Sequence, residues 1–138
     1  MGKELLNTFN KELLLKDLCA RLPYGVKVRT TYISPKTKKR DDVGIDVLCA
    51  VGISMLIEGY EEHKPYLFPL SSMTEEQKQY LKNRFCYDWN GEPYDLWICQ
   101  IEIGDADELI DWFNKNHIDY RNLIDENLAI DATGLNIY

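Results

Sequence analysis

The sequence lacks the residue patterns by which most enzymes and metalloproteins are recognised. Its 138 residues include only two histidines and four cysteines. The sequence contains no C-x-x-C pair, no G-x-S-x-G motif and no glycine-rich phosphate loop. Two histidines without a positional signal do not define a catalytic triad. We therefore predict no catalytic residue, no metal site and no cofactor.

Long apolar runs are also missing. No run approaches the roughly 20 apolar residues that a membrane span requires. Charged residues interrupt the apolar positions of residues 1–20, so this segment lacks the continuous apolar core of a signal peptide. The four cysteines are widely spaced, which favours free and mostly buried thiols in a reducing compartment. These cysteines are Cys19, Cys49, Cys86 and Cys99. We expect a soluble, cytoplasmic protein with no membrane partner.

Basic residues are outnumbered, with 16 Lys and Arg against 23 Asp and Glu and a formal net charge of -7. This balance argues against broad binding to phosphate backbones. One short basic run, Lys36–Arg40, is immediately followed by acidic residues. It reads as a solvated loop tip, with weak nucleic-acid binding through Lys36, Lys38, Lys39 and Arg40 as the less favoured alternative. The acidic balance also permits a basic protein partner.

Amphipathic patterning, by contrast, is plentiful and indicates one domain over residues 1–138. Leucines recur at helical spacing in the first segment and predict a helix from about Asn7 to Arg21. β-branched residues predict a strand over Val26–Ile33. Two further strands, Val43–Val51 and Ile53–Tyr60, are expected at the centre of the sheet because this is the most apolar part of the chain.

Two prolines flank Tyr66–Phe68, and because proline supplies no N–H the segment is predicted to be a short edge strand or an extended segment. Thr74 and Gln77 have the spacing of a capping box, which predicts a helix that runs to about Phe85. An exposed edge at Tyr66–Phe68 would also allow homodimerisation by strand pairing.

The last third of the chain predicts a strand over Leu96–Ile103 and a helix capped by Asp105 that ends near Asn116. A helical turn is expected over Tyr120–Asn127. The predicted fold class is therefore α+β, with a mainly antiparallel sheet of about five strands, an amino-terminal helix and two or three later helices.

Three segments carry a resemblance to a known family: Leu15–Lys27, Lys64–Glu76 and His117–Ile124. In order and rough spacing they resemble a family of small uncharacterised proteins common in gut Bacteroidales genomes, prophages and mobile elements. Many members of that family have arginine at the position of Phe68 and glycine at the position of Asn122. The resemblance implies a phage or mobile-element accessory protein, and it implies no reaction.

The most suggestive polar cluster is His117, Asp119, Tyr120 and Arg121. A histidine near a carboxylate suits general acid–base chemistry, and an arginine suits an anion, so a small ligand-binding module or enzyme is one interpretation. The favoured alternative is structural: His117 complements the end of a helix dipole as a cation, Asp119 caps the next turn, and Arg121 pairs on the surface.

Aromatic residues offer a second candidate site. Tyr and Trp are favoured in protein-interaction hot spots because they bury a large area with few rotatable bonds. Five aromatic residues fall in predicted edge or loop segments: Tyr66, Phe68, Tyr87, Trp89 and Tyr94. We expect a non-enzymatic interaction or regulatory protein that binds a protein partner through them, and the alternative is that about half of the aromatic residues cover a small core.

Overall fold

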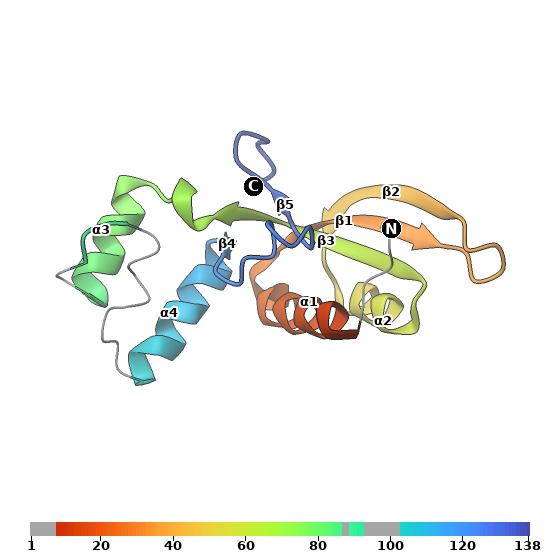
Figure 1. Ribbon diagram of the computed structural model, residues 1–138, viewed down its shortest axis with the longest axis horizontal. Helices are drawn as coiled ribbons and strands as arrows, with labels where there is room; N and C mark the ends of the chain where they lie inside the picture. Colours follow the sequence, from red (N-terminus) through yellow and green to blue (C-terminus); the bar gives the residue numbers. More distant parts are fainter. Residues whose placement is uncertain (1–7, 87–88, 93–102) are drawn as a thin grey trace.

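The α+β class is confirmed by a computed structural model, which describes residues 8–86, 89–92 and 103–138 (Figure 1). Four helices and five strands alternate irregularly along the described chain, with two short 3-10 turns. In chain order they are α1 (Thr8–Arg21), η1 (Leu22–Tyr24), β1 (Lys27–Ile33), β2 (Arg40–Val47), α2 (Ala50–Glu58), β3 (Glu61–Pro69), η2 (Leu70–Ser72), α3 (Glu75–Arg84), α4 (Ile103–Lys115), β4 (Ile118–Asp119) and β5 (Ile130–Asp131).

The sheet is mixed, with the order β2-β1-β3-β4 and with β5 also paired to β3. The two long ladders, β1 with β2 and β1 with β3, are antiparallel, whereas β4 and β5 run parallel to β3. The Phe68 amide donates to the His117 carbonyl at 2.8 Å, and the Ala132 amide donates to the Leu67 carbonyl at 2.8 Å. Adjacent residues of a strand point to opposite edges, so β4 and β5 lie on opposite sides of β3.

The predicted edge strand at Tyr66–Phe68 is therefore wrong, because this segment lies at the centre of the sheet. Pro65 is tolerated there because it pairs with Val28, at the end of the ladder between β1 and β3, and β5 takes over from Tyr66 onward. Proline costs a strand little where one neighbouring ladder ends and another begins. Tyr66–Phe68 therefore does not offer the exposed edge on which the predicted homodimer depended.

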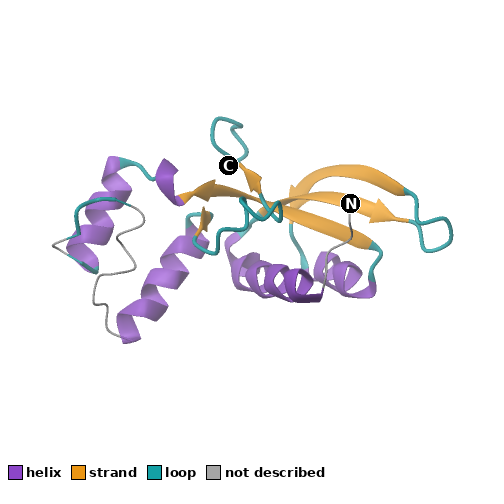
Figure 2. Ribbon diagram, in the orientation of Figure 1, coloured by secondary structure: helices purple, strands orange, loops and turns teal. Residues whose placement is uncertain are grey.

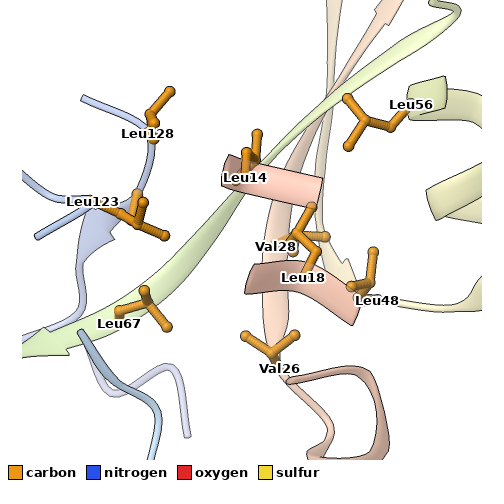
Figure 3. Close-up of a cluster of buried hydrophobic side chains, with 10 residues drawn as sticks. Leu14, Leu18, Val26, Val28, Leu48, Leu56, Leu67, Leu123 and Leu128 are labelled. Carbon is orange, nitrogen blue, oxygen red and sulfur yellow. The ribbon is translucent and has the colours of Figure 1, made fainter. Parts of the chain in front are cut away.

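Helices α1 and α2 cover one face of the sheet, and among the described residues no helix lies on the opposite face of β1 and β2 (Figures 1 and 2). The predicted leucine-rich helix is confirmed, since Leu14 and Leu18 are buried on the sheet side of α1. Figure 3 shows the resulting core, in which side chains from α1, β1, α2, β3 and the carboxy-terminal segment meet. Its buried members are Leu14, Leu18, Val26, Val28, Leu48, Leu56, Leu67, Leu123, Leu128 and Ala129.

The predicted strand over Ile53–Tyr60 is wrong, because most of this segment forms helix α2. Gly52 and Leu56, four residues apart, are buried together on one side of the helix, as helical spacing requires. Gly59 ends the helix with φ 85°, and its amide donates to the Leu56 and Met55 carbonyls. A short β-branched apolar run fits a strand and a buried helix equally well, so periodicity alone could not decide.

The other strand expected at the sheet centre, Val43–Val51, is also misplaced. Its first part belongs to β2, which lies at the edge of the sheet, and its last part enters α2. A β-bulge in β2 sets Val43 and Gly44 opposite Thr30, and Gly44 has φ 111°.

A second core lies between α3 and α4 and includes Leu81, Phe113 and Ile118. The predicted capping box of α3 is confirmed, since the Gln77 amide donates to Thr74 Oγ1 at 3.1 Å and the Thr74 amide donates back to the Gln77 side chain at 2.9 Å. Asp105 does not cap α4, which begins two residues earlier; instead it and Glu108 pair with Arg84.

Two other predictions for the last third of the chain are decided only in part. The predicted strand Leu96–Ile103 lies outside the described residues, except for its last residue, which begins α4. Residues Tyr120–Asn127 form a run of turns and not a helical turn.

The cysteines differ from the expected set of buried free thiols. Cys19 and Cys49 are free but exposed, and Cys86 is buried and disulfide-bonded. Cys99 lies outside the described residues. Within the part of the chain that the structure describes, no helix is long and apolar enough to cross a membrane.

Candidate functional site

The predicted polar cluster lies at the junction between α4 and β4, next to the centre of the sheet. His117 makes the turn between these elements with φ 59°, a left-handed conformation that is uncommon for residues other than glycine. Its amide donates to the Asn114 carbonyl at 3.2 Å, and its carbonyl accepts the Phe68 amide. The backbone of His117 therefore joins the last turn of α4 to β3.

Asp119 has the capping role that the structural alternative predicted. It is 5% exposed, and its two carboxylate oxygens accept the Leu123 and Ile124 amides, each at 2.9 Å. Because the carboxylate is committed to these amides, it does not orient His117 as the carboxylate of a catalytic dyad would. The interpretation of His117 and Asp119 as an acid–base pair therefore lacks the carboxylate that it requires.

Arg121 pairs inside the protein and not on its surface. Its Nε lies 3.2 Å from one carboxylate oxygen of Asp17, and Arg21 Nε donates to the other at 2.8 Å. Asp17 and Arg21 are both completely buried, one turn apart on α1. Burial raises the pKa of Asp17 above its usual value, while Arg21 and then Arg121 act in the opposite direction.

This buried ion group ties α1 to the last third of the chain. Arg21 Nη2 donates to the Ile118 carbonyl at 2.8 Å, and both guanidinium groups lie over the Tyr120 ring, Arg21 at 5.2 Å and Arg121 at 4.9 Å from its centroid. The Tyr120 ring also stacks on Phe113, with centroids 5.4 Å apart. Tyr120 thus packs against two cations and the second core.

His117 is covered by Tyr138. The two rings are stacked, with centroids 3.7 Å apart and an interplanar angle of 9°. Burial, and then the nearby charges of Arg21 and Lys27, lower the pKa of His117 to about 4. The imidazole is therefore neutral at pH 7, so it does not complement the α4 dipole as a cation.

The Tyr138 hydroxyl bridges β1 and β3 just beyond the end of their ladder. It accepts the Lys27 amide and donates to the Tyr66 carbonyl, both at 2.8 Å. The ladder between β1 and β3 ends one step earlier, at Val28 and Pro65, so the hydroxyl bridges the strands where direct pairing has stopped. Burial raises the pKa of Tyr138 to about 12, which keeps this donor protonated.

Three buried polar atoms find no hydrogen-bond partner among the described residues: Arg21 Nη1, His117 Nδ1 and Asn114 Oδ1. Sequence reasoning found His117 but missed Asp17, Arg21 and Tyr138. The i, i+4 pair of Asp17 and Arg21 within a leucine-rich helix was a usable signal, because that spacing supports an ion pair. No sequence pattern indicated where Tyr138 would fold back.

The three segments that carry the family resemblance meet at this cluster. The first supplies Asp17, Arg21 and Lys27, the second supplies Tyr66, and the third supplies His117. Segments far apart in sequence thus converge on one polar junction between the two cores.

The predicted aromatic surface is not assembled as expected. Tyr66 is 4% exposed and Trp89 is 2% exposed, so neither presents a ring to a partner. Phe68 is half-buried and lies 6.0 Å from the Tyr138 ring. Tyr87 and Tyr94 lie outside the described residues.

The basic run forms the hairpin connection between β1 and β2, as expected for a loop tip. Lys36, Lys38 and Lys39 are exposed. Arg40 is already paired with Glu62 of β3, with one contact at 3.1 Å from Nη1 to Oε2. Nucleic-acid binding through this loop stays a prediction, with one of its four cations engaged elsewhere.

Three exposed apolar side chains lie close together in sequence on β2. Val43, Ile45 and Val47 are 63%, 45% and 48% exposed, and we call these three residues the β2 edge. Ile45 and Val47 pair with Arg29 and Lys27 of β1, and paired residues share a face of the sheet. These two residues therefore face away from α1 and α2.

The acidic residues of β2 flank this apolar row. Asp42 is held by Arg29, with a contact of 3.0 Å between Oδ1 and Nε, and the pair lowers the pKa of Asp42 below its usual value. Asp41 and Asp46 are exposed. Asp46 lies opposite Val28, on the face that α1 and α2 cover.

The chain matches no protein-family model, no curated protein sequence and no solved structure. The described residues contain no group of three or more His, Cys, Asp and Glu side chains placed to hold a metal ion.

Proposed function

We propose that this protein is a non-enzymatic interaction or regulatory protein, of the accessory type carried by phages and mobile elements, and that it binds a protein partner through the β2 edge. The observation that carries the proposal is the row of Val43, Ile45 and Val47, exposed on a strand that is paired on one side only within the described residues. Contiguous exposed apolar side chains and unpaired strand edges are both features of binding surfaces. The accessory setting is supported by the sequence resemblance alone.

The fold holds β2, the strand of the proposed binding surface, in a rigid position. β2 is paired with β1 from Arg40 to Val47 except at Val43 in the bulge, and β1 packs on α1 through Val28. A rigid strand presented at a sheet edge binds extended segments with little ordering cost to itself. Of the aromatic residues first predicted for this role, Tyr66 and Trp89 are buried instead.

The test is photo-crosslinking in lysate of the native host, with a photoreactive amino acid at Val43. We expect one protein to be crosslinked, and the yield to fall about tenfold when Ile45 and Val47 are both changed to threonine. Threonine keeps the β-branched shape and strand preference and removes apolar surface. Leu135→Thr is the matched control, because Leu135 is 50% exposed outside the β2 edge. Equal yields from all three proteins, or no crosslink, would refute the proposal.

A second candidate function, binding of a small anion, is favoured by the unpartnered nitrogens of Arg21 and His117. Arg21 and Lys27 both lie close enough to His117 to lower its pKa, and Arg21 and Arg121 share the single carboxylate of Asp17. Thermal-shift measurements with phosphate and acetate test this function. A rise in melting temperature with either anion that disappears in Arg121→Gln would support it, and no rise would remove it.

A further inference from the structure

We infer that the partner of the β2 edge is a basic extended segment, which adds to the sheet as an antiparallel strand with apolar residues on one face and lysine or arginine on the other. This inference rests on the proposed function and specifies the chemistry of the partner. It follows from which backbone groups β2 leaves open and from where its charges lie.

The open backbone groups follow from the ladder with β1. The Leu48 amide donates to the Val26 carbonyl at 2.9 Å, so this pair is a hydrogen-bonded one. In an antiparallel ladder hydrogen-bonded pairs alternate with non-bonded ones, so Ile45 and Val47 direct their N–H and C=O groups away from β1. Ile45 can therefore form a pair of hydrogen bonds with a residue of an incoming strand.

One backbone amide on the open side of β2 already has a hydrogen-bond acceptor. The Val47 amide donates to Asp46 Oδ1 at 2.8 Å, within the same strand. A carboxylate that engages an edge amide discourages indiscriminate pairing, as charged residues do on many natural edge strands. A lysine on the incoming strand can neutralise this carboxylate, whereas an acidic or uncharged residue cannot.

The two faces of β2 favour different side chains on the incoming strand. Ile45 and Val47 lie on the face that α1 and α2 do not cover, so residues opposite them are best apolar and β-branched. Asp46 lies on the other face, and Asp41, which pairs with Tyr32, lies there as well because the bulge restores that orientation. A segment that alternates apolar and basic residues satisfies both faces.

A second copy of the chain fits this edge poorly. β2 carries three aspartates and one arginine, and the arginine is engaged by Glu62. Two such strands side by side would place like charges across the ladder, which destabilises pairing. The whole chain has a net charge of -7, which adds to the repulsion between copies.

The test uses a fluorescein-labelled synthetic peptide with the sequence valine–lysine–valine–threonine–valine–lysine, followed by fluorescence anisotropy on the intact protein. In the antiparallel register its first three residues lie opposite Val47, Asp46 and Ile45. We expect binding that weakens at least tenfold when both lysines become glutamate. It should weaken similarly when the valine opposite Ile45 is N-methylated, since that removes its N–H.

The protein variant Asp46→Asn isolates the charge, because the asparagine oxygen still accepts the Val47 amide. We expect about threefold weaker binding, the range of one exposed ion pair, and no change for Asp107→Asn, an exposed acid on α4. No peptide binding, or binding indifferent to N-methylation and to Asp46→Asn, would overturn the inference. A dimer joined through β2 in solution would also overturn it. A crosslink at Val43 that persists in those cases would leave the proposed function standing.

Discussion

The Tyr138 ring lies flat on the His117 imidazole, with the ring centroids 3.7 Å apart. This contact brings the last residue of the sequence against the turn between α4 and β4. The Tyr138 hydroxyl reaches past it to bridge β1 and β3. The Tyr138 side chain thus links the carboxy-terminal segment to the sheet and to the end of helix α4. Its ring and its hydroxyl can be tested separately.

Tyr138→Phe keeps the stacked ring and removes the hydroxyl bridge. The Lys27 amide and the Tyr66 carbonyl then lose their shared partner, so we expect the free energy of unfolding to fall by about 1–2 kcal/mol. Chemical denaturation measures the change. Tyr60→Phe is the control, since Tyr60 is exposed. Equal effects of the two substitutions would show that the bridge contributes nothing.

The lowered pKa of His117 predicts acid sensitivity. The pKa is about 4 in the folded protein against an ordinary value of 6.5, so between these values the unfolded chain binds a proton that the folded protein does not. The free energy of unfolding therefore falls as pH drops from about 6.5 to about 4. Allowing for partial solvent exposure, we expect a loss of about 2 kcal/mol.

His117→Asn is the matched variant for this pH dependence. Asparagine tolerates the left-handed backbone of residue 117 and does not titrate. The raised pKa of Asp17 acts in the opposite sense at low pH, so the informative quantity is the difference between the two proteins. Denaturant unfolding at several pH values measures it, and parallel profiles for both proteins would contradict the prediction.

The sequence predicts well those elements whose signals are local. The leucine spacing of α1 and the Thr74–Gln77 capping box both depend on residues within a few positions of one another. Helix α2 was missed because the β-branched residues Val51, Ile53 and Ile57 lie in an apolar run that also suits a strand. Its identity depends on Gly52 fitting against His63 of β3, a contact between separate elements.

The candidate site shows the same division. Asp119 as a cap is a local feature, and the sequence indicated it. The partners of Arg121 and His117 are Asp17 and Tyr138, more than 15 residues away in the chain, and only the topology brings them together. The position of Tyr66 inside the sheet likewise depends on its pairing with β5, which lies far downstream in the chain.

The buried pair of Asp17 and Arg21 predicts a strong dependence on both members. Arg21→Met removes one of the two cations at Asp17, and we expect a loss of about 3–5 kcal/mol because a buried carboxylate is left less compensated. Arg21→Lys should not restore stability, since one ammonium cannot reproduce the bonds to both Asp17 and the Ile118 carbonyl.

The double variant Asp17→Leu, Arg21→Met tests whether the pair acts as a unit. The double variant leaves no charge at positions 17 and 21, and only the partly exposed Arg121 loses its carboxylate, so its loss should be smaller than the sum of the two single losses. Thermal and denaturant unfolding of the four proteins give the coupling energy. Additive losses would show that Asp17 and Arg21 contribute independently.

Gly52→Ala is predicted to destabilise the protein, although alanine normally stabilises a helix interior by about 1 kcal/mol relative to glycine. A Cβ at position 52 would lie 3.3 Å from His63 Nε2 and 3.4 Å from a Leu48 methyl carbon. His63 cannot readily move, because Thr30 Oγ1 lies 2.9 Å from its Nδ1 and the Gly52 carbonyl lies 3.0 Å from its Nε2. We expect a net loss of about 1 kcal/mol, of the order found for overpacked cores. Ser54→Ala, at an exposed position of the same helix, should gain a few tenths, and a comparable gain for Gly52→Ala would show that the contact with His63 relaxes freely.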